Sequence, residues 1–121
     1  MRIIIVLPGY ARLPTGGYKV AYAYANGLAA RGHMVTIVYP MLIHTRAHLA
    51  LRAKELLYHV VVRLDRRAPW FTLDRNVRVR WALTLRERAM PDADVIIATA
   101  WQTAEWVCGY GAAKGRKYHL I

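Results

Sequence analysis

RIIIVLPGYARLPTGGYKVAYAYANGLAAR, residues 2–31, predicts a β-strand, a glycine-bearing loop and an α-helix in succession. Residues 3–7 are apolar, mostly β-branched and unbroken, as in a strand that is buried on both faces. The loop follows at residues 8–17. The helical pattern after it ends at Gly32, which suits a left-handed C-terminal cap. This order of elements is the opening of a βαβ unit.

The loop ends in Thr15, Gly16 and Gly17, immediately before the predicted helix. Backbone N–H groups at the start of a helix have no partner inside it, and the helix dipole there favours negative charge. Paired glycines allow a phosphate or a sugar to approach the backbone closely. A tight turn that needs two glycines explains the same pair equally well, because glycine pairs are common in loops.

Length and composition indicate one globular domain. The chain has 121 residues, 56% of them hydrophobic, and a mean hydropathy of +0.14. No apolar run reaches the roughly 18 residues that a membrane-spanning helix needs, and Pro8 breaks the first run too early for a signal peptide. The single cysteine, Cys108, excludes an internal disulfide and fits a reducing cytoplasm. We expect Cys108 to pack within a helix rather than act as a nucleophile.

The charge balance is strongly basic. Lysine and arginine number 18 against 7 aspartates and glutamates, which gives a net charge of +11. A surplus of this size indicates an anionic partner, which could be nucleic acid, a lipid headgroup or a phosphorylated substrate. A genomic base composition that favours arginine codons would produce the same surplus without any partner.

Strand and helix patterns alternate along the rest of the chain. Strands are expected at residues 34–39, 77–83, 95–98 and 118–121, and a further helix at 103–110. This alternation predicts an α/β fold, a Rossmann-like doubly wound parallel sheet with helices on both faces, in a single domain over residues 1–121 that is incomplete at its C-terminal end.

Two loops are candidate ligand-binding loops in such a sheet, because ligands bind beyond the carboxyl ends of the strands. They are residues 8–17 and 99–103. Thr99 and Gln102 have capping-box spacing at the start of the following helix. Gly27, inside the first helical pattern, is interpreted as a close contact between helix and sheet.

Residues 42–67 predict a long helix with a polar stripe. At about 100° per residue, one side carries His48, Arg52, Glu55, His59, Arg63 and Arg66. The other side carries Leu49, Ala53, Leu56, Leu57, Val60 and Leu64. One interpretation is a helix that covers the sheet and keeps a solvated basic face. The other is an interfacial helix on anionic lipid, with Arg52, Arg63 and Arg66 as membrane contacts.

Several enzyme classes are excluded by motifs that the sequence lacks. The first loop is not G-x-G-x-x-G, and the second strand ends in Tyr39-Pro40 rather than in an acid for a ribose, so a dinucleotide dehydrogenase is not expected. The sequence contains no G-x-x-x-x-G-K-[ST] and no G-x-S-x-G. The five histidines are scattered and no Cys/His cluster has zinc spacing, so we expect no metal site.

Two segments resemble a known family. The sequence VLPGY…PTGGYKVAYAYANGLAARGHMVTIVYP, within residues 2–40, and PDADVIIATAWQTAEWV, residues 91–107, resemble the N-terminal domain of family 4 glycosyltransferases of the GT-B fold. In that family a first strand leads to a loop that ends in a glycine pair, and a helix and a second strand follow. The resemblance is specific in these two segments and loose over residues 41–88.

The resemblance implies that the complete protein transfers a sugar from a nucleotide-sugar, with UDP- or GDP-sugar as donor, to a saccharide or lipid-linked acceptor. It places Thr15, Gly16 and Gly17 at the donor and acceptor cleft. It also places there the residues after the fourth strand, which are Trp101, Gln102 and Thr103. It implies no tightly bound cofactor and assigns no catalytic residue to this chain.

In the family, a C-terminal domain with an E-x7-E-type motif holds most of the donor, and these 121 residues contain no such motif. The resemblance therefore implies that this chain alone is inactive and supplies the acceptor side of the cleft. We expect a cytoplasmic protein, with peripheral contact at the inner face of the membrane as a further expectation.

Two other interpretations stay open. A basic, non-catalytic α/β module that binds nucleic acid would explain the charge and would use Trp70, Trp81 and Trp101 as stacking groups. No recognised nucleic-acid motif is present and the basic residues are spread along the chain, so nucleic acid is the less favoured partner. A regulatory or interaction module without a ligand is the third interpretation.

Overall fold

The computed structural model describes residues 1–42, 49–62 and 70–121. Its centre is a five-stranded, all-parallel sheet with the strand order β3-β2-β1-β4-β5. The strands are β1 (Arg2–Val6), β2 (Met34–Pro40), β3 (Arg78–Ala82), β4 (Val95–Ala98) and β5 (Arg116–His119). The helices of the described residues are α1 (Gly16–Ala30), α2 (Leu49–Val62) and α3 (Trp101–Val107), with short 3-10 turns at Glu87–Ala89 and Ala112–Lys114.

β1 is the central strand and pairs along both edges. Ile3 lies opposite Val35 of β2 and opposite Val95 of β4. Since side chains alternate along a strand, Ile3 and Ile5 point to one face of the sheet while Ile4 points to the other. All three are buried, which confirms the sequence prediction of a strand enclosed on both faces.

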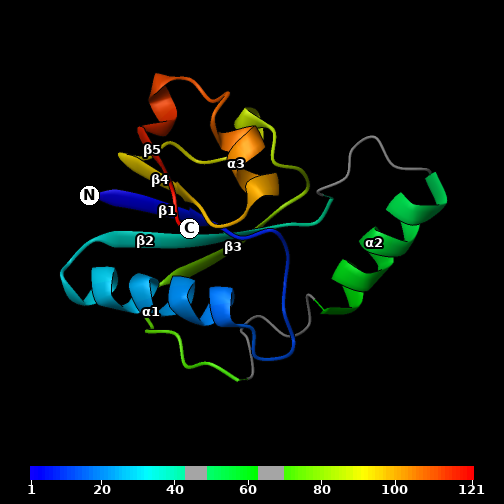
Figure 1. Ribbon diagram of the computed structural model, residues 1–121, viewed down its shortest axis with the longest axis horizontal. Helices are drawn as coiled ribbons and strands as arrows, with labels where there is room; N and C mark the ends of the chain where they lie inside the picture. Colours follow the sequence, from blue (N-terminus) through cyan, green and yellow to red (C-terminus); the bar gives the residue numbers. More distant parts are fainter. Residues whose placement is uncertain (43–48, 63–69) are drawn as a thin grey trace.

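Helix α1 covers the first face of the sheet over β1 and β2 (Figure 1). The helix contributes small side chains and one large aromatic ring to this core, namely Ala21, Tyr22, Ala25 and Ala29. The sheet contributes the β-branched side chains of Ile3, Ile5, Val35 and Ile37. Alanines at the contact let the helix lie close to the strands, and the ring of Tyr22 fills the remaining space.

Helix α3 covers the opposite face (Figure 1). Its Val107 packs with the second set of alternating strand residues, which includes Ile4 and Ile96. Leu85 and Met90, from the connection between β3 and β4, complete this core. Helices on both faces of an all-parallel sheet confirm the Rossmann-like doubly wound architecture.

Glycines end two of the elements with backbone that other residues rarely adopt. Gly32 has φ of +88° just after α1, and its N–H donates to the carbonyl of Ala29 at 3.0 Å. The left-handed cap predicted from the sequence is therefore present. Gly115 has φ of +75° before β5, and a Cβ there would lie 2.2 Å from the carbonyl oxygen of Asp94.

Three expectations from the sequence are wrong. Gly27 makes no close contact with the sheet, because it is exposed and a Cβ there would meet nothing within 4 Å. Cys108 is exposed rather than packed. Helix α2 does not cover the sheet: Figure 1 shows it to one side, and Leu49 and Leu57 are 81% and 65% exposed.

Replacing Gly27 with alanine is expected to raise the free energy of unfolding by about 0.5–1 kcal/mol, the usual cost of glycine in a helix interior. Urea unfolding followed by circular dichroism measures the change. Gly115→Ala is expected to have the opposite effect and lower the free energy of unfolding. The added methyl group would collide with the Asp94 carbonyl, and the positive φ at this position disfavours alanine. A less stable Gly27→Ala chain would contradict the open geometry around this glycine.

Candidate functional site

The carboxyl ends of β1 and β4 form the candidate site. Strand order reverses here, because the chain runs outward from β1 through β2 to β3 and then returns to the other side of β1. Crevices at such reversals are where open α/β sheets bind ligands. Val6 lies opposite Ala98, and the Thr99 hydroxyl donates to the Val6 carbonyl at 2.8 Å. The loops after the two strands therefore begin side by side.

The first half of the loop between β1 and α1 is anchored by aromatic side chains. The Tyr18 hydroxyl donates to the carbonyl of Gly9 at 2.8 Å, and the Trp70 indole N–H donates to the carbonyl of Ala11 at 3.0 Å. Tyr10, between these two carbonyls, is buried. Three consecutive loop residues are thus fixed by groups that the sequence analysis did not connect with the site.

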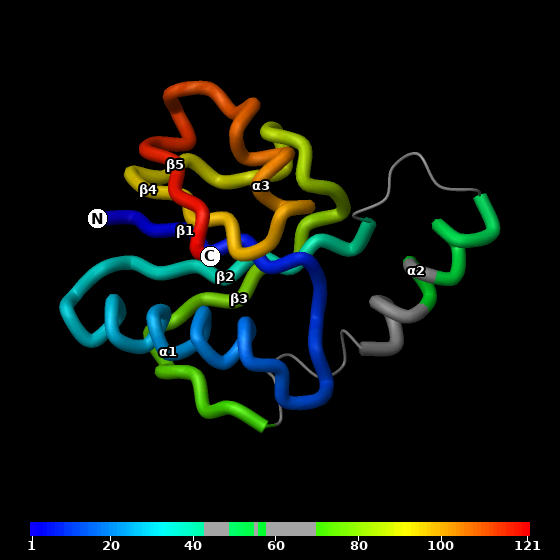
Figure 2. Tube along the Cα trace, viewed as in Figure 1, coloured from blue at the N-terminus to red at the C-terminus, as the bar shows by residue number. Residues whose placement is uncertain are grey.

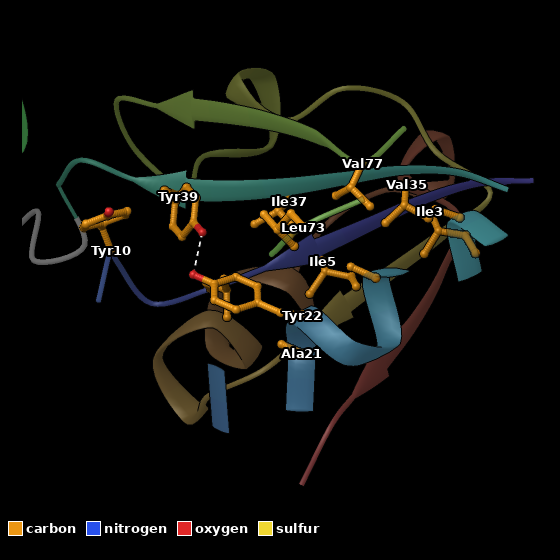
Figure 3. Close-up of a cluster of buried hydrophobic side chains, with 13 residues drawn as sticks. Ile3, Ile5, Tyr10, Ala21, Tyr22, Val35, Ile37, Tyr39, Leu73 and Val77 are labelled. Atoms are coloured by element: carbon orange, nitrogen blue, oxygen red, sulfur yellow. Dashed lines mark hydrogen bonds between the residues drawn. The ribbon is translucent and has the colours of Figure 1, made fainter. Parts of the chain in front are cut away.

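Tyr10 packs on an aromatic cluster at the carboxyl ends of β2 and β3. Its ring centroid lies 5.6 Å from that of Tyr39 and 5.9 Å from that of Trp81. The Tyr39 hydroxyl in turn forms a buried hydrogen bond of 2.6 Å with the Tyr22 hydroxyl, drawn as a dashed line in Figure 3. The ring of Tyr22 also contacts Trp70, at 5.5 Å between centroids. Together these contacts join the loop, α1 and the sheet.

Burial keeps the two bonded tyrosines of this cluster neutral. It raises the pKa of Tyr22 to about 12, with a smaller opposing effect from the hydrogen bond of Tyr39. Burial raises the pKa of Tyr39 well above its usual range, and the neighbouring Tyr22 adds to this shift. Neither hydroxyl can act as an acid or a base near neutral pH, so the pair is part of the support for the loop.

The second half of the same loop is open. Thr15, Gly16 and Gly17 are exposed, and a Cβ built on either glycine would meet nothing within 4 Å. The Thr15 hydroxyl donates to the carbonyl of Leu13 at 3.3 Å and makes no capping bond to α1. The first turn of α1 also contains no acidic residue. The N–H groups of Gly16 and Gly17, which have no acceptor within the helix, and the positive end of the helix dipole therefore lie at an exposed turn.

One side-chain hydroxyl group holds the loop between β4 and α3 together through hydrogen bonds to the loop backbone. The Oγ1 atom of Thr103 accepts from the N–H groups of Thr99 and Ala100, both at 3.1 Å, and donates to the Ala100 carbonyl at 2.8 Å. Thr103 is fully buried. The expected capping box of Thr99 with Gln102 is wrong, because α3 begins at Trp101 with Ala100 as its N-cap.

The predicted cleft residues consequently lie in different environments. Trp101 is 64% exposed, Gln102 is half-buried and the Thr103 hydroxyl is engaged inside its own loop. Gly16 and Gly17 begin the helix on one face of the sheet, and Trp101 begins the helix on the other (Figure 1). The structure brings together the starts of the two loops rather than all the predicted side chains.

The two loops after β1 and β4 offer groups for binding rather than acids or bases. Residues 7–17 and 99–103 contain one charged side chain, Arg12, and no acid, histidine or cysteine. Within the described residues, no group of three or more His, Cys, Asp or Glu side chains could hold a metal ion. Exposed backbone N–H groups beside a basic residue are suited to an anionic or hydroxyl-rich ligand.

Acidic side chains pair with basic ones at the opposite, amino-terminal edge of the sheet. The Lys114 ammonium lies 2.8 Å from the Asp92 carboxylate, and its hydrogen bond lowers the pKa of Asp92. The Arg2 backbone N–H donates to Asp94 at 2.7 Å, and this bond lowers the pKa of Asp94. These two acids therefore balance basic groups far from the candidate site.

The remaining candidate residues are distributed as follows. Arg52 is half-buried on α2, while Arg63 and Arg66 lie outside the described residues. Trp70 and Trp81 are half-buried in the aromatic cluster, which contradicts the expectation that both offer exposed rings for stacking. Among the described residues, no helix is long and apolar enough to cross a membrane.

Comparison of the chain with models of protein families gives no match. Comparison with curated proteins gives no significant match either.

Replacing Thr103 with valine is expected to lower the free energy of unfolding by about 1–3 kcal/mol, because it leaves two backbone N–H groups without their acceptor inside the fold. Thr103→Ser keeps the hydroxyl and should retain most of the stability. Urea unfolding measures both variants. Equal stability of the valine and serine variants would contradict the role of this hydroxyl.

The buried tyrosines predict a stability that falls at high pH. The unfolded chain releases its tyrosine protons near pH 10, whereas folded Tyr22 holds its proton to about pH 12. The resulting stability is complete below about pH 10 and is lost as the pH rises toward about 12. Urea unfolding at a series of alkaline pH values measures this decline.

The double variant Tyr22→Phe, Tyr39→Phe tests the origin of the decline. When both hydroxyls are removed together, no buried hydroxyl is left without a hydrogen-bond partner. The stability at neutral pH should therefore change little. Its alkaline decline should be shallower, with the remainder from Tyr110, whose pKa burial raises to about 12. An unchanged slope in the double variant would contradict this assignment.

Proposed function

We propose that this chain is the acceptor-side domain of a nucleotide-sugar-dependent glycosyltransferase of the family 4, GT-B type. The complete enzyme would transfer a sugar from a UDP- or GDP-sugar to a saccharide or lipid-linked acceptor. Two kinds of support are independent of each other: the motifs of residues 2–40 and 91–107, and the form of the edge where β1 and β4 end.

One observation carries the proposal. At the point where strand order reverses, α1 begins with two glycines that have open space around them and no side-chain cap. A helix start of this kind can admit a phosphate or a sugar hydroxyl to its backbone N–H groups, since no side chain stands in the way. The proposal assigns this contact to Gly16 and Gly17.

The anchored half of the loop would supply rigidity. Hydrogen bonds to the carbonyls of Gly9 and Ala11 fix the strand end from which the open half extends. Precise placement of a bound group accounts for much of an enzyme's rate enhancement, and small displacements are costly. On this proposal the aromatic cluster has a positioning role, and Trp101 offers an exposed ring against which a sugar can stack.

The side chains of the two loops indicate which role this domain would have in the complete enzyme. The two loops contain no acid or histidine, so this domain would bind and orient the substrates. The groups that hold most of the donor would belong to a second, C-terminal domain. Arg12 is the basic side chain of the first loop, in the same segment as Gly16 and Gly17.

The nucleic-acid module is less well supported by the geometry. Stacking on single-stranded nucleic acid requires exposed aromatic faces. Of the three tryptophans considered for that role, Trp70 and Trp81 contact other aromatic rings of the cluster, which leaves Trp101.

The test is a nucleotide-sugar transfer screen on the product of the open reading frame that contains these residues, with UDP-, GDP- and ADP-sugars and saccharide or lipid-linked acceptors. Gly16→Leu and Gly17→Leu should each lower turnover about 100-fold or more, because the side chain blocks close approach to the backbone. Both variants should fold normally, since a Cβ has open space at each position.

Gly27→Leu is the matched control. It makes the same substitution in the same helix at another glycine with open space, and it should keep full turnover. Equal losses in all three variants would indicate a general effect on α1 and would contradict a site at its first turn. No turnover with any donor, together with tight and salt-sensitive binding of RNA or DNA, would favour the nucleic-acid module.

A further inference from the structure

Helix α2 exposes leucine side chains that the rest of the described chain does not cover. Leu49, Leu51 and Leu57 are 81%, 51% and 65% exposed, and Leu56 is 38% exposed. Figure 2 shows α2 displaced from the sheet and from both helices that pack on it. Several exposed leucines on one helix indicate a surface that a membrane or another molecule covers.

The leucines form a stripe with a basic residue on each border. At about 100° per residue, Leu49, Ala53, Leu56 and Leu57 share one side of α2. Arg52 flanks this side on one edge and Lys54 flanks it on the other. Long basic side chains can lay their methylene stems along an apolar stripe while the charged group reaches outward. Leu51 lies on the opposite side.

The sequence around α2 is basic. Residues 43–69 contain six lysines and arginines, Arg46, Arg52, Lys54, Arg63, Arg66 and Arg67, against two acids, Glu55 and Asp65. Elsewhere, Asp92 forms an ion pair with Lys114, and Asp94 forms one with Arg2. The basic surplus of residues 43–69 therefore favours an anionic partner for this segment.

We propose that α2 is an interfacial helix that docks this domain on an anionic phospholipid surface. Leu49, Leu56 and Leu57 enter the boundary between headgroups and acyl chains, while Arg52 and Lys54 contact the headgroup phosphates. Apolar burial and charge attraction act together in such helices, so each alone gives weak binding. The inference is independent of sugar transfer, since its residues belong to neither of the two candidate loops.

A lipid surface fits these observations better than a second copy of the chain does. Two copies that met through α2 would bring two basic segments together, and like charges in an interface oppose association. An anionic membrane reverses that sign, because basic residues near such a surface each contribute about 1 kcal/mol of attraction.

The experiment is co-sedimentation of the protein with vesicles of phosphatidylglycerol and phosphatidylcholine, compared with vesicles of phosphatidylcholine alone. Binding should require the anionic lipid. Leu57→Gln should lower the partition coefficient about tenfold. Leu51→Gln, the same change on the opposite side of the same helix, should leave it within about twofold.

Charge is tested with Arg52→Gln and Lys54→Gln, each of which should weaken binding about fivefold. Arg75→Gln and Arg86→Gln remove the same charge from exposed positions outside α2 and should have smaller effects. Circular dichroism checks that each variant keeps its fold.

Three outcomes would overturn the proposal. They are equal binding to neutral and anionic vesicles, equal losses in Leu57→Gln and Leu51→Gln, and absence of vesicle binding in the unsubstituted protein. Sedimentation velocity examines the competing occupant: a dimer that Leu57→Gln dissociates, without any binding to vesicles, would assign the stripe to a second copy of the chain.

Discussion

The central position of β1 is the constraint on which the rest of the structure depends. This strand is hydrogen-bonded to β2 along one edge and to β4 along the other, and side chains from α1 and α3 bury its two faces. A strand enclosed in this way is apolar at its buried positions, as Ile3 to Val6 are. Its carboxyl end lies beside that of β4, and the loops to α1 and α3 begin at these two strand ends, so the same burial that stabilises the sheet positions the candidate site.

The sequence was sufficient to predict the fold because its signals are local. Unbroken apolar runs, a glycine after a helix and strands alternating with helices predict the parallel α/β sheet, and the strand expected at residues 77–83 is present as the edge strand β3. The incorrect predictions concern spatial neighbours. Gly27, Cys108 and the leucines of α2 each have a pattern typical of a packed residue, but in the described part of the chain they are exposed.

The candidate site was predicted in outline and not in detail. Sequence reasoning located the two loops, because loop position follows from strand position. It did not identify Tyr10, Tyr18 and Trp70 as the anchors of the first loop, since Trp70 and Ala11 are 59 residues apart and no local pattern links them. It also treated Thr103 as a cleft residue, whereas its hydroxyl closes its own loop. A threonine three residues after a helix N-cap was the available signal for that role.

The hydrogen bond from Trp70 to Ala11 has a consequence for the order of folding. A contact between residues so far apart in the sequence has a larger entropic cost of loop closure than a local contact, and folds dominated by such contacts form slowly. During synthesis, the first strand, loop and helix emerge well before Trp70 does, and the loop at that stage lacks its anchor. The anchored geometry of the first loop therefore requires a residue from the segment just before β3.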